Sequence, residues 1–202
     1  MHCKSIEDEN KYLSQNPLMK IALRKFSQGV INLSLLCKPK NILDIGCGNG
    51  FVTKELAKTF PKAKITAVDI EAEKIAYAKK NNNLSNITYQ RRNLFRLGFK
   101  KNSFDLVICN EVIEHLQNYK KALEIISSLS SEHIIVSVPN EPFFRIATFL
   151  RGKFLRSLGN MPGHIHNWSK DEFVKLLGPY GKLIKVFTPV VWTVALIKKR
   201  GL

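Results

Sequence analysis

Residues 44–50, with the sequence DIGCGNG, constrain the fold of this chain more than any other stretch. The apolar run 41–43 leads into them, and residues 51–60, which have helical character, follow. Glycines at alternate positions remove side chains from the turn, so the backbone can approach a ligand while the first N–H groups of the next helix stay free. Such a turn at the carboxyl edge of a parallel sheet is where α/β proteins hold nucleotide-like ligands. The stretch therefore predicts an α/β fold with a ligand at this turn.

The spacing of the glycines separates two kinds of ligand. The fingerprint that binds a pyrophosphate is G-x-G-x-x-G, whereas this chain reads D-x-G-x-G-x-G, with Asp44 at the end of the expected strand. A carboxylate at that position repels a pyrophosphate, but it suits a ligand that carries an ammonium and a sulfonium. We therefore expect a cationic nucleoside in place of a dinucleotide.

Two further segments also read as strands that end in polar residues. Residues 65–69, ITAVD, predict a second strand that ends at Asp69, and residues 104–110, FDLVICN, predict a fourth strand that EVIEHL follows. With residues 44–50, these segments resemble the class I S-adenosylmethionine-dependent methyltransferases, in which the glycine turn is motif I. The resemblance runs from about Tyr12 to the C-terminus.

The resemblance implies a fold and a cofactor. The fold is a doubly wound, Rossmann-like α/β sheet of seven mostly parallel strands, with the last strand antiparallel between the fifth and the sixth and helices on both faces. The cofactor is S-adenosyl-L-methionine, whose ribose hydroxyls can both donate to a carboxylate such as Asp69. The residues expected to bind it are Asp44, Gly46, Cys47, Gly48, Gly50, Asp69, Ile70, Asn93, Leu94 and Asn110.

Asn93 departs from the family pattern. After the expected third strand, residues 87–90, the family usually has an Asp that accepts from the adenine amino group. The carbonyl oxygen of Asn93 can accept the same hydrogen bond, although without charge. The alternative is that Asn93 is only a loop residue.

Periodicity predicts the remaining elements. Strand and helix signals alternate, which indicates a parallel doubly wound sheet. Helices are expected at 17–36, 51–60, 72–81, 119–129 and 169–177, and the final strands at 134–138, 183–187 and 190–197. Ser169 with Glu172 has the spacing of a capping box. The helix at 17–36 is expected to pack on the sheet and cover the ligand.

The composition fits a single methyltransferase domain, residues 1–202, with an N-terminal helical cover at 1–40 and an amphipathic, substrate-side insertion at 139–168. No apolar stretch approaches the ~20 residues that span a bilayer, and the start of the chain lacks the apolar core of a signal peptide. The four cysteines include no C-x-x-C pair, which suggests reduced thiols and a cytoplasmic protein.

The net charge of +16 is unevenly placed. No Asp or Glu occurs between Pro142 and Lys170 or between Gln90 and Ser103, although both segments contain several Lys and Arg residues. Such surfaces attract nucleic acid, anionic lipid or acidic small molecules. The alternative is a cationic surface without a dedicated partner.

Residues 143–158 have helical amphipathicity, with aromatic and aliphatic residues on one side and Arg145 and Arg156 on the other. Such a helix can lie in an anionic membrane interface, cover a substrate pocket, stack on single-stranded bases or simply pack in the core. The segment also resembles the insertion of the ubiquinone-biosynthesis O-methyltransferase branch, which implies a hydrophobic or membrane-embedded acceptor and a location cytoplasmic or peripheral to the membrane.

Two groups of residues are candidates for acting on the acceptor. Glu111, Glu114 and His115 share one face if a helix begins at Glu111, and His115 with Glu114 is our candidate catalytic pair, without a metal ion. His164 and His166 are expected to be surface-loop histidines. An alternative is that these residues bind Mg²⁺ or Mn²⁺, because they resemble the metal-binding set of small-RNA 3′-end 2′-O-methyltransferases. Another is that Glu114 and His115 merely cap and orient a helix.

These features favour an S-adenosylmethionine-dependent methyltransferase that acts on a small or lipid-like acceptor at oxygen. A 2′-O-specific RNA methyltransferase, metal-assisted or not, is the first alternative, because of the charge and the Glu/Glu/His set; no RNA-binding module is recognisable. A non-catalytic S-adenosylmethionine-binding protein is the second. The sequence does not indicate an oligomeric state.

Overall fold

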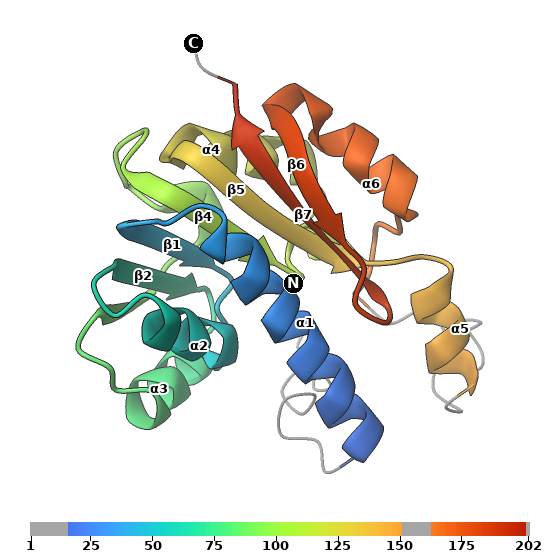
Figure 1. The fold of residues 1–202 in the computed structure, drawn as a ribbon, viewed down its shortest axis with the longest axis horizontal. Coiled ribbons are helices and arrows are strands. Elements are labelled where there is room, and N and C mark those ends of the chain that lie inside the picture. The colour runs from blue at the N-terminus through green and yellow to red at the C-terminus, as the bar shows by residue number, and fades with distance from the viewer. Residues whose placement is uncertain (1–15, 151–162, 201–202) are drawn as a thin grey trace.

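A computed structural model describes residues 16–150 and 163–200, which form a seven-stranded sheet with helices on both faces (Figure 1). The strands are β1 (Asn41–Ile45), β2 (Lys64–Asp69), β3 (Ile87–Arg91), β4 (Phe104–Asn110), β5 (Ser130–Pro139), β6 (Gly181–Phe187) and β7 (Trp192–Lys199). The helices are α1 (Pro17–Leu35), α2 (Phe51–Thr59), α3 (Ala72–Asn81), α4 (Tyr119–Leu129), α5 (Phe143–Leu150) and α6 (Lys170–Leu177), with 3-10 turns at Leu94–Arg96, Ile113–His115 and Gly178–Tyr180.

The strand order is β3-β2-β1-β4-β5-β7-β6. Strands β1 to β5 pair in parallel, and β7 runs antiparallel to both β5 and β6, which confirms the predicted sheet. The chain begins in the middle of the sheet, moves outward to β3 and returns to β4 on the other side of β1. Loops therefore diverge beyond the carboxyl ends of β1 and β4, where open α/β sheets bind ligands.

The sheet is buried on both faces because its strands present apolar side chains alternately to each side. In β4, Leu106 and Ile108 join the core beneath α1 and α2, while Val107 and Cys109 join the core beneath α4 and α6. All four side chains are fully buried. Two apolar layers thus fix the position of β4, and with it the polar residues at its carboxyl end.

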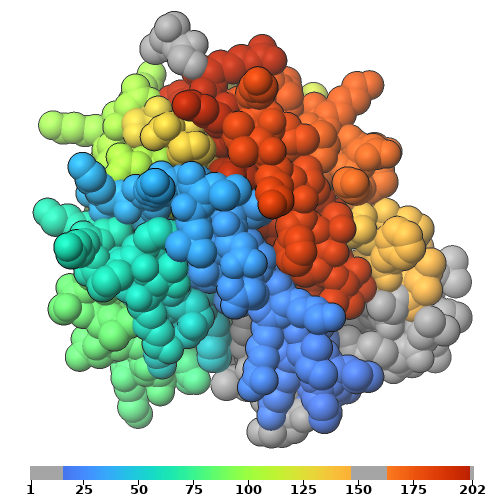
Figure 2. Space-filling view, in the orientation of Figure 1, coloured from blue at the N-terminus to red at the C-terminus, as the bar shows by residue number. Residues whose placement is uncertain are grey.

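Helix α1 lies between α2 and the β6–β7 hairpin, as Figure 2 shows. The Asn16 side chain accepts hydrogen bonds from the first turn, and Pro17 occupies the first helical position, where a missing N–H costs nothing. Phe26 is buried against Trp192 of β7, with 5.1 Å between ring centroids. The helix therefore closes one face of the sheet next to β7.

The C-terminal elements match their sequence signals. Ser169 and Glu172 form the predicted capping box, in which the Ser169 N–H donates to Glu172 Oε2 at 2.8 Å. Strand β5 extends at both ends beyond the predicted 134–138. In the described part of the chain, no helix is long and apolar enough to cross a membrane.

Helix α5 is the described part of the amphipathic segment. Phe143 and Ile146 are 59% and 51% exposed, and Arg145 is partly buried between them. The predicted continuation of this helix to residue 158 lies outside the described residues. The membrane contact predicted for 143–158 stays a prediction.

Candidate active site

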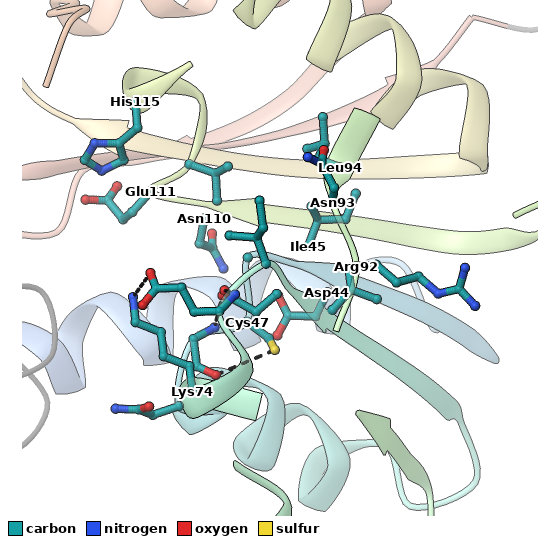
Figure 3. A pocket seen from close by; sticks show the side chains of 18 of the residues that line it. Asp44, Ile45, Cys47, Lys74, Arg92, Asn93, Leu94, Asn110, Glu111 and His115 are labelled. Carbon is teal, nitrogen blue, oxygen red and sulfur yellow. Dashed lines mark hydrogen bonds and ion pairs between the residues drawn. The ribbon is translucent and has the colours of Figure 1, made fainter. Parts of the chain in front are cut away.

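A cavity of about 420 Å³ lies at the carboxyl ends of β1, β2 and β4 (Figure 3). Figure 3 shows His115 and Glu111 at one end of it, Asn93 and Arg92 at the other, and Asn110 and Cys47 between them. Its lining includes every predicted cofactor-binding residue except Gly50, namely Asp44, Gly46, Cys47, Gly48, Asp69, Ile70, Asn93, Leu94 and Asn110. Helix α1 contributes no lining residue, so its predicted role as a cover for the ligand stays a prediction.

The glycine turn is held in a shape that L side chains rarely adopt. Gly46, Gly48 and Gly50 have φ of 73°, 53° and 76°. The N–H groups of Gly46 and Cys47 both donate to the Val68 carbonyl, at 2.8 and 3.0 Å, which joins the turn to β2. The three glycines therefore satisfy a backbone requirement as well as a need for space.

The space around the glycines differs from one to the next. A Cβ on Gly46 would collide with Val112, and one on Gly50 would press on Tyr89 and Asn82. Among the residues that the structure describes, no heavy atom would lie within 4 Å of a Cβ on Gly48. Only Gly48 thus opens directly onto free space; the absence of side chains at the other two lets the turn pack against the protein.

Asp44 is buried, 2% exposed, and accepts a hydrogen bond from Thr53 Oγ1 at 2.6 Å. Burial raises the pKa of its carboxyl to about 6, while the Thr53 hydroxyl lowers it and the charge of Asp69 raises it. An ionised carboxylate in this position is stabilised by a cation in the cavity. This is the electrostatic preference inferred from the D-x-G-x-G-x-G spacing.

Asp69 connects the glycine turn to the loop after β2. Its Oδ2 accepts from the Gly48 N–H at 2.8 Å, and its Oδ1 accepts from the Glu71 N–H at 2.9 Å. A carboxylate has about four acceptor positions, so two remain for ligand hydroxyls. The carboxylate is thus oriented by the backbone before a ligand arrives.

Two asparagines line the cavity with different degrees of hydrogen bonding. Asn93 Oδ1 accepts from the Phe95 N–H at 2.8 Å and caps a 3-10 turn, so it has the loop role that was the alternative for this residue, while it also lines the cavity. Both polar side-chain atoms of Asn110 are buried, and among the described residues neither has a hydrogen-bond partner. A buried amide without partners next to a cavity is suited to binding a polar ligand.

The two cysteines, Cys47 and Cys109, occupy different environments. Cys47 lines the cavity, and burial together with the nearby charges of Asp44 and Asp69 raises the pKa of its thiol far above the usual range. Cys109 lies entirely in the core. Both thiols are therefore neutral near pH 7 and unsuited to nucleophilic chemistry.

Glu111 does not lie in a helix with Glu114 and His115, so the predicted shared face is wrong. Glu111 has φ of 55°, and the 3-10 turn begins two residues later, at Ile113. Its carboxylate instead accepts from Trp192 Nε1 at 2.7 Å and from Ser137 Oγ at 3.2 Å. These bonds to β7 and β5 hold Glu111 at the wall of the cavity.

Glu114 and His115 are adjacent but differently exposed. The Glu114 side chain is fully buried, whereas 28% of the His115 side chain is exposed and His115 lines the cavity. His115 Nε2 lies 4.0 Å from Glu114 Oε1, and His115 Nδ1 lies 2.9 Å from the Gly163 carbonyl oxygen. His115 can therefore reach a ligand directly, and Glu114 can act only through a neighbour.

The prediction that His164 is a surface-loop histidine is wrong. His164 is 8% exposed, and its ring lies edge-on to His115, with 4.9 Å between centroids. The reason is a long-range contact: the N–H groups of Ile165 and His166 both donate to the Glu114 carbonyl, at 3.0 and 3.2 Å. His166 is also partly buried, with its ring stacked on Trp168.

Several residues that shape the site were not identified from the sequence. Thr53 could have been expected, because it lies in the first turn of the helix after the glycine loop. Val112, Ser137, Trp192 and Gly163 come from separate elements, and no spacing rule connects them to the motifs.

Comparison with known proteins identifies the family. Residues 37–176 match the family model described as a methyltransferase domain. The malonyl-(acyl-carrier protein) O-methyltransferase of Bacillus cereus is 36% identical over 140 residues, which are 67% of this chain and 52% of that protein. The release factor glutamine methyltransferase of Bacteroides thetaiotaomicron is 36% identical over 145 residues, 68% of this chain and 51% of that protein. The chain thus spans about half the length of the curated relatives it matches.

The fold has close parallels among solved structures. The magnesium protoporphyrin IX methyltransferase of Synechocystis PCC 6803, solved with bound S-adenosylhomocysteine, has a TM-score of 0.74 at 18% identity, covering 98% of this chain and 95% of that chain. The predicted family and fold class are therefore confirmed: the chain belongs to the methyltransferase domain family and has the fold of the class I S-adenosylmethionine-dependent methyltransferases.

Proposed function

We propose that this protein transfers the methyl group of S-adenosyl-L-methionine to an oxygen atom of a small or lipid-like acceptor. The observation that carries the proposal is the glycine turn, where Gly48 lines the cavity together with the carboxylates of Asp44 and Asp69. This arrangement suits a nucleoside that carries positive charge. Family membership supports the reaction class.

We expect the donor to bind in one orientation. The carboxylate of Asp69 has acceptor positions for the ribose hydroxyls, and the buried charge of Asp44 favours the cationic methionine portion. Asn93 then faces the adenine end of the cavity together with two apolar lining residues, Ile70 and Leu94. The amide of Asn110, which has no hydrogen-bond partner among the described residues, lies between the two ends.

This orientation places the transferable methyl group toward His115. A sulfonium is already an activated donor, so the protein mainly aligns the acceptor in line with the S–CH₃ bond. His115, which lines the cavity and is oriented by the contact of its Nδ1 with the Gly163 carbonyl, is the group we assign to activate the acceptor oxygen. Glu111, fixed by Trp192, is a second polar group at the same end.

The acceptor class is supported by the relatives. The Bacillus cereus relative is named as an O-methyltransferase that acts on a malonyl group linked to acyl-carrier protein. That name supports oxygen as the methylated atom and an acyl-type acceptor. The other relative described above is named for glutamine methylation, so the acceptor must be determined by experiment.

We also propose that residues 143–158 make peripheral contact with an anionic membrane. Phe143 and Ile146 are exposed on α5, and Arg145 lies between them in sequence. Apolar side chains flanked by Arg suit the interface of an anionic bilayer. Flotation with anionic vesicles tests this contact. Phe143→Ser with Ile146→Ser should abolish it, whereas Leu36→Ser, at an exposed apolar position just after α1, should not.

The decisive experiment is transfer of tritiated methyl groups from the donor to fractionated lipid, metabolite, protein and RNA extracts. We expect base-labile or ether-linked label in the lipid, small-molecule or acyl-carrier fraction. Label confined to RNA or to protein glutamine would overturn the acceptor class. Donor binding by isothermal titration, without label in any fraction, would instead indicate a non-catalytic binding protein.

A further inference from the structure

Beside the cavity lies a cluster of possible metal ligands that the proposed reaction does not by itself require, and one of its members, His115, lines the cavity. One ligand atom each from Glu114, His115 and His164 lies within 4.8 Å of the others. We propose that these three residues bind a divalent transition-metal ion at the acceptor end of the cavity. The proposal rests on the proposed function only for the role of the ion, because binding of the ion can be measured without donor or acceptor.

The positions of the three groups are fixed by the backbone. The Glu114 carbonyl accepts from the N–H groups of Ile165 and His166, which holds the loop that carries His164 against the 3-10 turn that carries Glu114 and His115. Phe144 of α5 also packs against the His164 ring, with 5.3 Å between centroids. Backbone hydrogen bonds and ring packing thus bring His164 next to Glu114 and His115, which are distant from it in sequence.

The orientation of His115 is typical of a metal ligand. Ligating histidines usually direct one ring nitrogen to the ion and donate the other N–H to a backbone carbonyl or carboxylate. His115 Nδ1 lies 2.9 Å from the Gly163 carbonyl, which makes Nδ1 the protonated nitrogen. Nε2 is then left with a lone pair, and it is Nε2 that faces Glu114 Oε1.

The distances suit an ion better than a direct contact. Between His115 Nε2 and Glu114 Oε1 the separation is 4.0 Å, too long for a hydrogen bond. An ion at about 2.1 Å from each of two ligand atoms keeps them about 3 to 4.2 Å apart. Closing the largest separation in the cluster, 4.8 Å at most, requires a shift of about half an ångström.

The ligand types indicate which ion would bind. Two imidazoles and one carboxylate suit Zn²⁺, Mn²⁺, Fe²⁺ or Co²⁺, whereas Mg²⁺ prefers oxygen ligands. Three protein ligands leave coordination positions for an outside oxygen atom. Because His115 lines the cavity, an acceptor oxygen there is the natural additional ligand. The ion would lower the pKa of a bound acceptor hydroxyl, whose proton would then pass to water, while His115 would serve as a ligand of the ion.

The structure also narrows the set suggested by the sequence. The carboxylate of Glu111 accepts hydrogen bonds from Trp192 and Ser137. The Nε2 atom of His166 lies 3.1 Å from the Leu116 carbonyl oxygen, and the His166 ring stacks on Trp168. Neither belongs to the cluster whose ligand atoms converge.

Titration of metal-stripped protein with Co²⁺ tests the site, followed by visible d–d absorbance and by the number of ions retained per chain. We expect about one ion per chain and the spectrum of nitrogen-ligated Co²⁺. His164→Asn should weaken binding by more than about 100-fold and remove the spectrum. Because Glu114 is buried, Glu114→Gln is the least disruptive change there, and it should also weaken binding.

The matched control is His133→Asn. Glu132 and His133 form a second Glu-His pair, with 3.8 Å between His133 Nδ1 and Glu132 Oε2, but they lie outside the cluster. Equal Co²⁺ binding by the unmodified protein, His164→Asn and His133→Asn would overturn the site. Donor binding, measured on the same samples by isothermal titration, separates this outcome from failure of the proposed function, since donor affinity should not depend on His164.

Discussion

The donor end and the acceptor end of the cavity are built from different kinds of contact. At the donor end, Asp44 is held by Thr53, nine positions away, and Asp69 by Gly48 and Glu71, 21 and two positions away. At the acceptor end, His115 contacts the Gly163 carbonyl across 48 positions. Glu111 contacts Trp192 across 81 positions.

The difference teaches which part of the site can vary independently. The core of the proposed donor end, Asp44, Gly48 and Asp69, comes from two neighbouring strands and the loops that follow them, so a few residues at fixed spacing specify it. The acceptor end combines β4, β5, β7 and the loop at 163–166, so a change in any of them can alter its shape. A fold of this kind can keep one donor and take many acceptors.

The largest effect that would sharpen this comparison is expected at His115. His115→Asn should slow methyl transfer by about 10²- to 10⁴-fold, because activation of the acceptor oxygen is lost. Donor affinity should not change, since His115 is not among the residues proposed to bind the donor. The measurements are turnover with the labelled acceptor fraction and isothermal titration of the donor. Unaltered turnover would remove His115 from the mechanism.

Gly46→Ala tests whether the donor end depends on its packed turn. The variant combines left-handed strain of about 1–2 kcal/mol with a collision against Val112, and it should weaken donor binding by about 2–5 kcal/mol. Adding Val112→Ala should restore part of the affinity. Gly48→Ala is the companion variant: it meets no protein atom, so loss beyond the strain cost reports contact with the donor itself. Unchanged titrations for both variants would place the donor elsewhere.

A smaller loss is expected from Asp69→Ala. Removing this carboxylate should weaken donor binding by about 1–3 kcal/mol, through lost hydrogen bonds to the ribose and a less ordered glycine turn. Asp171→Ala, an exposed acid on α6, controls for the change in net charge. Equal effects of the two substitutions on a donor titration would show that only the overall charge matters.

The smallest effect is a pH dependence that originates at Asp44. Burial raises its pKa to about 6, so donor affinity should fall about tenfold from pH 7 to pH 5 as the carboxylate takes up a proton. Without donor, the folding stability depends on pH in the opposite direction, because it falls as the pH rises. The raised pKa contributes stability below the ordinary value of 3.8, and this stability is lost as the pH rises through about 6. Asp44→Asn should remove the pH dependence of donor affinity, measured by titration, and that of folding stability, measured by thermal unfolding. A pH dependence that persists in the variant would show that another group causes it.

The same contrast explains how much could be predicted from the sequence. The glycine turn, Asp44 and Asp69 were predictable because their roles follow from local spacing. The helix expected at Glu111 was wrong because the indole of Trp192 holds that carboxylate, and the backbone there is left-handed. The burial of His164 depends on a loop bound to the Glu114 carbonyl, and no periodicity in the chain encodes that contact.

Trp192 connects helix α1 to the wall of the cavity. One side of the indole packs against Phe26 of α1, and its N–H grips the Glu111 carboxylate inside the cavity. A displacement of α1 would therefore be transmitted through this ring to the end of the cavity where we propose that the acceptor binds. We expect substitutions on α1 that move Phe26 to change which acceptors are methylated, while donor affinity stays the same.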